Sequence, residues 1–160
     1  RHAMPPGEAI EAMAGSGPVP GLDAEQAAVA RAFVGEAMRR HLPLRAAEIA
    51  VATGLQESRL RVLANRSVPA SLHLPHSGFG ADHDSVGPLQ QRQSWGRTAD
   101  LMNPVTSVSK FYDKLLAVPN WHRLPLTVAA QAVQISGAPS AYAKHESAAR
   151  AIVHSIVTGG

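Results

Sequence analysis

Cysteine is absent from the sequence, and so is any long apolar run. Without cysteine, the chain forms neither a disulfide framework nor a thiolate metal site. No stretch approaches the roughly 18 uninterrupted apolar residues of a membrane-spanning helix, and residues 1–6 lack the apolar core of a signal peptide. We therefore expect no membrane span, and we expect a monomeric domain that belongs to a longer protein.

Blocks of like charge are also missing, although basic residues are in slight excess. The 160 residues carry 15 Lys and Arg against 12 Asp and Glu, a formal charge of +3 at pH 7. Such an excess suits an anionic partner, such as nucleic acid or cell wall, but does not identify one. With 45% hydrophobic residues, a chain of this length is expected to bury one core without metal or disulfide support.

The beginning of the chain differs from the rest in its proline and glycine content. Residues 1–22 contain enough of both to break regular structure, and they predict a linker or loosely docked arm with a short turn of helix at 8–13. Asp23 is then a good N-cap, and Gln26 completes a capping box. We therefore expect the folded domain to cover residues 23–160.

Apolar spacings of three and four residues predict helices along most of this domain. The first runs from Asp23 to near His41, and a second, apolar around much of its circumference and hence central, covers about 45–65. Further helices are predicted at 98–102, 104–116 and 127–135, and a last one from Ser140 onward. Residues 66–95, rich in proline and glycine, predict a long functional loop. No run of residues indicates a strand.

Residues 46–63 have two interpretations. They resemble a helix-turn-helix, in which Gly54 makes the turn and a recognition helix carries Glu57 and Arg61 to a DNA groove. Alternatively, one continuous helix places Glu57 on a stripe of small and apolar residues. A carboxylate on such a stripe is a group whose ionisation burial can tune, as acid/base catalysis requires.

Separated motifs later in the chain favour the second interpretation. Residues 56–58, Gln-Glu-Ser, are similar to the Glu-Ser pair of soluble lytic transglycosylases, and residues 84–92 (Asp-Ser-Val-Gly-Pro-Leu-Gln-Gln-Arg) resemble their Ser-x-Gly-Leu-x-Gln loop. Residues 129–136 (Ala-Ala-Gln-Ala-Val-Gln-Ile-Ser), followed by Pro139, Tyr142 and Lys144, resemble the actinobacterial form of the third motif. A helix-turn-helix protein explains neither of the later motifs, so nucleic acid is not the partner we expect.

The intervening segments resemble the same group of proteins. Residues 72–76, 94–96 and 102–104 look like the wall-hydrolase domains of actinobacteria and their phages, and the resemblance covers residues 42–150. Two departures bear on the shape of the site. Pro88 stands where the family usually has Leu, and Gly137-Ala138 precedes Pro139 where a bulkier residue is common.

The resemblance implies a mainly α-helical, lysozyme-like fold. A central helix would end at Glu57, a long loop or small β-hairpin at 66–92 would form one wall of a cleft, and residues 126–157 would form the other. The implied activity is cleavage of the β-1,4 bond between N-acetylmuramic acid and N-acetylglucosamine in peptidoglycan, with Glu57 as the acid/base carboxylate. Partial burial would raise its pKa from about 4.3 toward about 6, so that it can donate a proton near neutral pH.

Two reactions are open to such a site. A lytic transglycosylase, which we favour, needs no second carboxylate, because the acetamide oxygen of the substrate stabilises the anomeric carbon and a 1,6-anhydro sugar results. A lysozyme-type hydrolase holds a second carboxylate at roughly 6.5–9.5 Å to position water, and Asp82 or Asp84 lies in the loop where goose-type lysozymes carry one. A catalytically silent glycan-binding module is the remaining alternative.

The same motifs nominate side chains that contact substrate. Gln90 and Gln134 offer uncharged donors and acceptors suited to N-acetyl groups, and Tyr142 matches an aromatic residue that closes the cleft in the family. Trp95 lies beside the second motif, so we expect it, rather than Trp121, to stack on a sugar ring. The remaining candidates, of which the two glutamines are the weaker, are Ser58, Gln91 and Gln131.

A group of loop residues could surround a metal ion, namely His73, His76, Asp82, His83 and Asp84. Their spacing fits no metal motif, so we predict a polar loop held by hydrogen bonds to the backbone, with no metal and no cofactor. The expected partner is the glycan strand of peptidoglycan, which predicts a location outside the cytoplasm, in the cell wall or on a virion.

Overall fold

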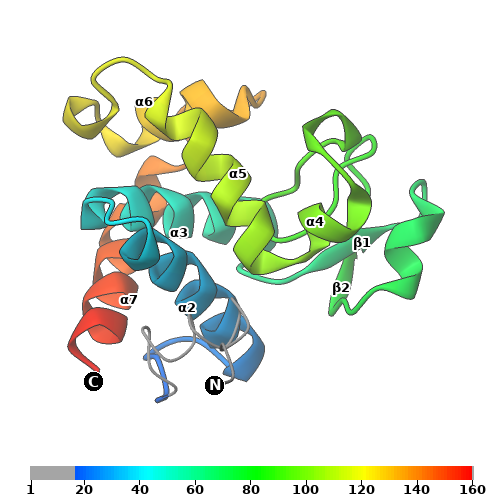
Figure 1. The fold of residues 1–160 in the computed structure, drawn as a ribbon, viewed down its shortest axis with the longest axis horizontal. Helices are drawn as coiled ribbons and strands as arrows, with labels where there is room; N and C mark the ends of the chain where they lie inside the picture. The colour runs from blue at the N-terminus through cyan, green and yellow to red at the C-terminus, as the bar shows by residue number, and fades with distance from the viewer. Residues whose placement is uncertain (1–16, 160) are drawn as a thin grey trace, which may run out of the picture.

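The computed structural model describes residues 17–159, which form a mainly helical domain (Figure 1). The elements follow the order α2 (Ala24–Arg39), α3 (Leu44–Ser58), β1 (Leu63–Asn65), η1 (Pro69–His73), β2 (Gly78–Gly80), η2 (Gln93–Trp95), α4 (Thr98–Met102), α5 (Pro104–Leu116), η3 (Trp121–Arg123), α6 (Leu126–Gln134), η4 (Ala143–His145) and α7 (Glu146–Thr158), where η marks a 3₁₀-helix. The predicted turn of helix at 8–13 and most of the predicted linker at 1–22 lie outside the described residues. The described part of that linker is docked, because Val19 is buried in the core and the Gly17 carbonyl accepts a hydrogen bond from Arg31.

The start of α2 confirms the predicted capping box. The Asp23 carboxylate accepts from the backbone N–H of Gln26 at 2.9 Å, and the Gln26 side chain accepts from the backbone N–H of Asp23 at 3.0 Å. These bonds satisfy donors that the first turn of a helix leaves without partners. The helix ends at Arg39, near the predicted end, and His41 follows with a φ of +56°.

Helix α3 is shorter than the helix predicted at 45–65. It ends at Ser58, and Arg59 and Leu60 both adopt the left-handed conformation, with φ of +56° and +59°. The Leu60 N–H donates to the Gly54 carbonyl, and its buried side chain folds back onto Gly54, where an added Cβ would lie 2.7 Å from Leu60 Cδ2. The chain therefore reverses at this point through a Schellman-type end without glycine at the left-handed positions.

The same geometry rules out the helix-turn-helix at 46–63. Gly54 lies inside α3 and makes no turn, and the residues after Ser58 lead to strand β1 rather than to a recognition helix. Glu57 and Arg61 therefore lie on opposite sides of a chain reversal instead of on one DNA-reading helix.

Residues 62–103 form a small lobe that contains the short sheet, contrary to the expectation of no strand. Strands β1 and β2 pair in parallel, with Leu63 opposite Gly78 and Asn65 opposite Gly80. Of the long loop or small β-hairpin expected at 66–92, the hairpin is wrong for β1 and β2, because parallel strands need a crossover, which here contains η1. The lobe has its own cluster of buried residues, Ala64, Val68, Val86, Leu101 and Met102.

The remaining helices form a larger helical lobe around α3. Helices α2, α5, α6 and α7 all pack against α3, and the main hydrophobic core lies between them. Figure 1 shows the small lobe, with β1, β2 and α4, to one side of this bundle, and α5 running between the two parts. Among the described residues, no helix is both long and apolar enough to cross a membrane.

Helices α4, α5 and α6 confirm the predictions at 98–102, 104–116 and 127–135 to within a residue. The last helix begins at Glu146 rather than at Ser140. Residues 138–145 instead form successive turns, in which Ala141 donates to Ala138, Ala143 to Ser140, and His145 to Tyr142. These turns let the Tyr142 side chain reach the interior, where it is 1% exposed.

Candidate active site

The Glu57 side chain lies in the last turn of α3 and is half-buried. Its Oε2 accepts a hydrogen bond from Gln134 Nε2 at 2.9 Å and one from the Tyr142 hydroxyl at 3.4 Å. Burial is the largest influence on this carboxyl group and raises its pKa above the ordinary value of 4.5. The two hydrogen bonds oppose this rise, whereas the nearby charge of Asp82 adds to it.

Ser58 anchors the end of α3 to the loop at 85–91. Its buried hydroxyl donates to the Pro88 carbonyl at 2.6 Å and accepts from the Arg61 N–H at 3.2 Å. The hydroxyl therefore has protein partners on both sides. This geometry gives Ser58 a supporting role in place of the substrate contact that the sequence suggested.

The loop at 85–91 owes its course to Gly87. This residue has a φ of +84°, and a Cβ added to it would lie 1.9 Å from the Leu101 carbonyl oxygen. Its N–H donates to the Leu63 carbonyl at 2.8 Å, which fixes the loop to β1. Glycine is required here for both its conformation and the close backbone approach, and the loop can then present the Leu89 carbonyl to the site.

Gln134 connects the two sides of the site. Its Nε2 donates to Glu57 Oε2 and also to the Leu89 carbonyl at 3.0 Å, and since both partners are acceptors the side-chain amide must point its nitrogen toward them. Its Oε1 is buried and has no hydrogen-bond partner among the described residues. A buried acceptor without a partner costs free energy unless another group supplies a donor, so this oxygen is the one buried polar side-chain atom near Glu57 that is left unsatisfied within residues 17–159.

Tyr142 completes the immediate surroundings of Glu57, as the third motif predicted. Its ring is buried, and burial raises the pKa of its hydroxyl to about 12. The hydroxyl therefore stays protonated and can donate to Glu57 at any physiological pH. Ser136, which also hydrogen-bonds this hydroxyl, lies in the turn after α6.

Gln131 holds that turn in place. Its Nε2 donates to the Ser136 carbonyl at 2.9 Å, and its Oε1 accepts from the Ser136 N–H and hydroxyl. Both ends of the side chain are thus used within the protein. Gln131 positions the residues that surround Glu57, and nothing in its geometry supports the expected substrate contact.

The two candidate second carboxylates lie in different environments. Asp84 forms an ion pair with Arg92, which holds the pKa of Asp84 below its ordinary range. Asp82 is exposed, hydrogen-bonds His83 Nδ1 at 2.6 Å, and is the one whose charge raises the pKa of Glu57. Of the two, Asp82 is therefore the carboxylate electrostatically coupled to Glu57.

The adjacent glutamines of the second motif lie in different environments, Gln90 in the loop and Gln91 in the interior. Gln90 is half-buried in a left-handed conformation; its Nε2 donates to the Gly87 carbonyl, and its Oε1 lies so close to Gly80 that a Cβ there would be 2.6 Å away. Gln91 is 1% exposed and exchanges hydrogen bonds with Ser107 in the interior. The expected substrate contact of Gln91 is therefore wrong in this structure, because a buried side chain with both ends bonded cannot reach a ligand.

The tryptophans do not join Glu57. Trp95 is half-buried against both hydrophobic clusters, and Lys114 Nζ lies 4.5 Å from the centroid of its ring. Trp121 is 8% exposed within the main core. Trp121 is thus packed within the protein, and Lys114 lies over one face of the partly exposed Trp95 ring.

The loop histidines make local contacts. His76 Nδ1 lies 2.7 Å from the Leu74 carbonyl and His83 Nδ1 contacts Asp82. Across residues 17–159, no group of three or more His, Asp or Glu side chains is arranged to hold a metal ion. Asp84 is bonded to Arg92, so four of the five loop residues, His76, Asp82, His83 and Asp84, have partners within the protein.

Sequence reasoning missed two contacts close to Glu57. His145 Nε2 lies 2.9 Å from Gln56 Oε1, beside the catalytic candidate, and burial lowers the pKa of that histidine. The Leu89 carbonyl, which holds Gln134, is a backbone group, and no residue type in the sequence signals it. His145 carried no motif, so its place became visible only from the fold.

No protein-family model matches the sequence, and no curated protein matches it. The site is therefore defined by its own geometry: a half-buried glutamate at a helix end, held by an amide and a phenol that come from α6 and the turn before η4.

Proposed function

We propose that this domain cleaves the β-1,4 bond between N-acetylmuramic acid and N-acetylglucosamine in peptidoglycan, with Glu57 as general acid and base. One observation carries the proposal. Glu57 combines partial burial, a raised pKa and two neutral hydrogen-bond donors on a single carboxylate oxygen. This is the environment that lets a carboxylic acid keep its proton near neutral pH and still release it to a leaving group.

The hydrogen bonds assign roles to the two oxygens of Glu57. Both donors bind Oε2, so we assign the transferable proton to Oε1. Gln134 and Tyr142 stabilise the ionised form once the proton has left, because hydrogen bonds to a carboxylate favour its charge. The glycosidic oxygen receives the proton as the anomeric carbon acquires oxocarbenium character.

A lytic transglycosylase reaction uses these groups without an enzyme nucleophile. The acetamide oxygen of the substrate would stabilise the anomeric carbon, and ionised Glu57 would then remove the proton from the C6 hydroxyl to give a 1,6-anhydro end. Gln134 supports this route through its Nε2, which donates to Oε2 of Glu57 and so stabilises the ionised carboxylate that removes the C6 proton.

Hydrolysis is the second candidate, and Asp82 favours it. This carboxylate is exposed, forms no ion pair with a Lys or Arg among residues 17–159, and raises the pKa of Glu57 through its charge. A carboxylate opposite the general acid can position and deprotonate a water molecule in an inverting glycosidase. The domain would act on the cell wall from outside the cytoplasm in either case.

Product analysis tests the proposal. Purified cell wall would be digested with wild type, Glu57→Gln, Asp82→Asn and the matched control Asp84→Asn, and the released fragments analysed by mass spectrometry. We expect 1,6-anhydro ends from wild type, no release by Glu57→Gln, and nearly normal release by Asp84→Asn. Reducing ends that disappear in Asp82→Asn would establish hydrolysis instead. Equal release by wild type and Glu57→Gln would overturn the proposal, and binding to wall without release would identify a silent module.

A further inference from the structure

A second hydrogen bond joins the end of α3 to the turns at 138–145, beside the one between Tyr142 and Glu57. His145 Nε2 lies 2.9 Å from Oε1 of Gln56, the residue that precedes Glu57 on α3. An amide oxygen only accepts, so the histidine carries a proton on Nε2 and donates it. Both side chains are half-buried, so the contact is partly shielded from water.

The same histidine is tied to Tyr142 through the backbone. The His145 N–H donates to the Tyr142 carbonyl at 3.1 Å, so the two residues are the ends of one short turn. At one end the Tyr142 hydroxyl donates to Glu57, and at the other the His145 ring donates to Gln56. The turn is therefore bonded to two neighbouring side chains of α3.

The two bonds differ in length. At 3.4 Å the bond from Tyr142 is long for a hydroxyl donor, whereas the 2.9 Å bond from His145 has an ordinary length. Packing of the buried Tyr142 ring keeps the turn in the interior, but the distance from its hydroxyl to Glu57 depends on where the turn lies relative to α3. Among the described residues, 140–145 make no other side-chain hydrogen bond to α3. The shorter bond therefore fixes this distance.

We infer that His145 is a positioning residue, which keeps the Tyr142 hydroxyl within reach of Glu57 by holding Gln56. Without the histidine, the turn would be released and the distance between Tyr142 and Glu57 would lengthen. Since the hydrogen bond from Tyr142 lowers the pKa of Glu57, its loss should raise that pKa. The consequence for catalysis rests on the proposed function, whereas the effect on the carboxyl group can be measured in the resting protein.

The charges around His145 leave its bond to Gln56 intact. Burial and the neighbouring charge of Lys144 lower the pKa of the ring, so it is neutral at pH 7. A neutral ring with its proton on Nε2 donates to Gln56, and a protonated ring does so as well. Glu146, the next residue, pairs with Arg45 of α3. Titration of the histidine therefore does not break the contact.

Titration of the Glu57 carboxyl group by NMR tests the inference without any substrate. The resonance is assigned by its absence from Glu57→Gln, and Asp82, the charge that acts on Glu57, is retained throughout. We expect the pKa of Glu57 to rise in His145→Ala and in Gln56→Met, which removes the acceptor. His145→Gln should keep the wild-type value, because its amide can donate to Gln56 as the imidazole does. The matched control is His154→Ala, at an exposed position of α7, which should change nothing.

A double variant separates positioning from a general loosening of the structure. If His145 acts through Tyr142, then His145→Ala combined with Tyr142→Phe should raise the pKa of Glu57 no further than Tyr142→Phe alone. Additive rises would overturn the inference, and so would a wild-type titration in His145→Ala. If His145→Ala does not fold, Gln56→Met supplies the same comparison from the other side of the bond.

Wall digestion distinguishes this inference from the proposed function. His145→Ala should move the alkaline limb of the kcat profile to higher pH, as Tyr142→Phe does, and leave KM unchanged. If Glu57→Gln digests wall as wild type does while the titrations are as expected, the proposed function fails and the positioning role stands. If Glu57→Gln is inactive and His145→Ala titrates as wild type, only the positioning role fails.

Discussion

The Glu57 carboxyl group is subject to opposing influences within a few ångströms. Burial and the charge of Asp82 raise its pKa, while hydrogen bonds from Gln134 and Tyr142 lower it, and the net direction is upward. An acid that must donate a proton works below its pKa, so activity that depends on Glu57 should decline as pH rises through that value. In the proposed reaction, the neighbours of Glu57 would thereby set the pH range of activity.

Replacing Glu57 with glutamine should separate activity from stability. Loss of the acid should lower kcat by about 10²- to 10⁴-fold. Because the folded pKa lies above the ordinary 4.5, the folded state holds this proton more tightly, and the stability it contributes is present at low pH and lost as pH rises through the folded value. Glu57→Gln should therefore be more stable than wild type at pH 7 and equal to it near pH 4, as measured by urea unfolding.

An exposed glutamate provides the control for that measurement. Glu25→Gln removes a carboxylate of the first turn of α2, where negative charge is favourable, and should bring no gain at pH 7. Identical unfolding midpoints for wild type and Glu57→Gln at pH 7 would show that burial does not oppose the ionisation of Glu57.

The two donors to Glu57 should differ in their effect on the pH profile. Gln134→Ala removes the 2.9 Å hydrogen bond to the carboxylate, which raises the pKa of Glu57 further and moves the alkaline limb of the kcat profile to higher pH. Tyr142→Phe removes the longer, 3.4 Å bond, so its shift should have the same sign and be smaller. A profile that moves to lower pH in either variant would contradict the assigned role.

The end of α3 shows how an element can stop without a recognised stop signal. Arg59 and Leu60 are both left-handed, although neither is glycine or asparagine. Each such residue costs roughly 1–2 kcal/mol in local conformation, and the burial of Leu60 against Gly54 offsets that cost. The reversal places Glu57 at the edge of the helical lobe and sends the chain directly into the small lobe.

Arg59→Gly should stabilise the protein by about 1 kcal/mol, because glycine adopts a positive φ without steric strain. The Arg59 side chain is exposed, so little packing is lost. Ala148→Gly is the comparison, since glycine at an exposed position within α7 should destabilise by about 1 kcal/mol. Thermal unfolding of the two variants checks both signs, and a destabilised Arg59→Gly would mean that the arginine side chain is needed at the reversal.

Gly87→Ala, in the loop at 85–91, should destabilise the protein. A Cβ there meets the Leu101 carbonyl at 1.9 Å, at a φ of +84°, and we expect a loss of roughly 2–4 kcal/mol. Urea unfolding measures the loss. Gly137→Ala, where an added Cβ has open space, is the matched control and should change stability little.

Sequence patterns predicted those elements whose ends are marked by side chains. Asp23 with Gln26 marks the start of α2, and Pro104 marks the start of α5. The end of α3 has no such mark, because it depends on Leu60 packing onto Gly54. Strand β2, Gly-Phe-Gly, has no strand propensity of its own and depends on pairing with β1.

The site was predictable to a similar extent. Motif order brought Gln134 and Tyr142 to Glu57, and the structure shows both in contact with its carboxylate. Asp82 and Asp84 could not be distinguished before the fold was known, because the difference is the ion pair that Arg92 makes with Asp84. Gln91 was misassigned because burial, and not residue type, separates it from Gln90.

At the scale of the whole molecule, the two lobes differ in the size of their cores. The helical lobe has an extensive core around α3, whereas the small lobe is held by a cluster of only a few buried residues. Local opening requires less free energy where fewer apolar contacts must break. The small lobe should therefore open more readily than the helical lobe.

Hydrogen exchange of backbone amides tests this difference. Amides in β1 and β2 should exchange at least tenfold faster than amides in the middle of α3, such as that of Val51, under conditions where the folded state is stable. Equal protection in both regions would show that the lobes unfold as one cooperative unit.

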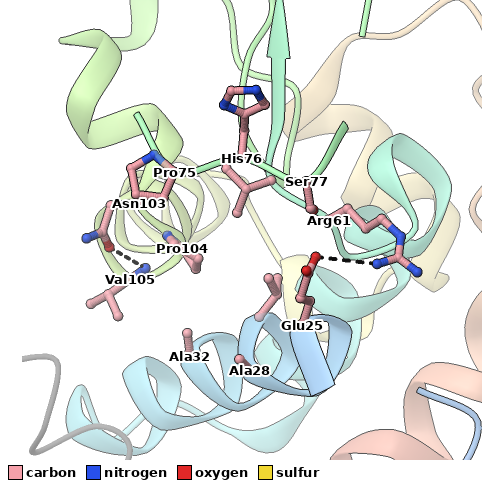
Figure 2. A pocket seen from close by; sticks show the side chains of 12 residues that line it. Glu25, Ala28, Ala32, Arg61, Pro75, His76, Ser77, Asn103, Pro104 and Val105 are labelled. Carbon is pink, nitrogen blue, oxygen red and sulfur yellow. Dashed lines mark hydrogen bonds and ion pairs between the residues drawn. The ribbon is translucent and has the colours of Figure 1, made fainter. Parts of the chain in front are cut away.

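A pocket of about 460 Å³ lies between the two lobes, lined by α2, by the chain at 61–62 and 75–77, and by the start of α5 (Figure 2). The backbone enters the small lobe near Arg61 and leaves it near Asn103, and both crossings are walls of this pocket. Any rotation of one lobe on the other pivots about these crossings, so the width of the pocket changes with the rotation angle. A molecule bound in this pocket would lie at the pivot of that rotation. It would limit how far the small lobe, which carries Asp82, can move toward Glu57.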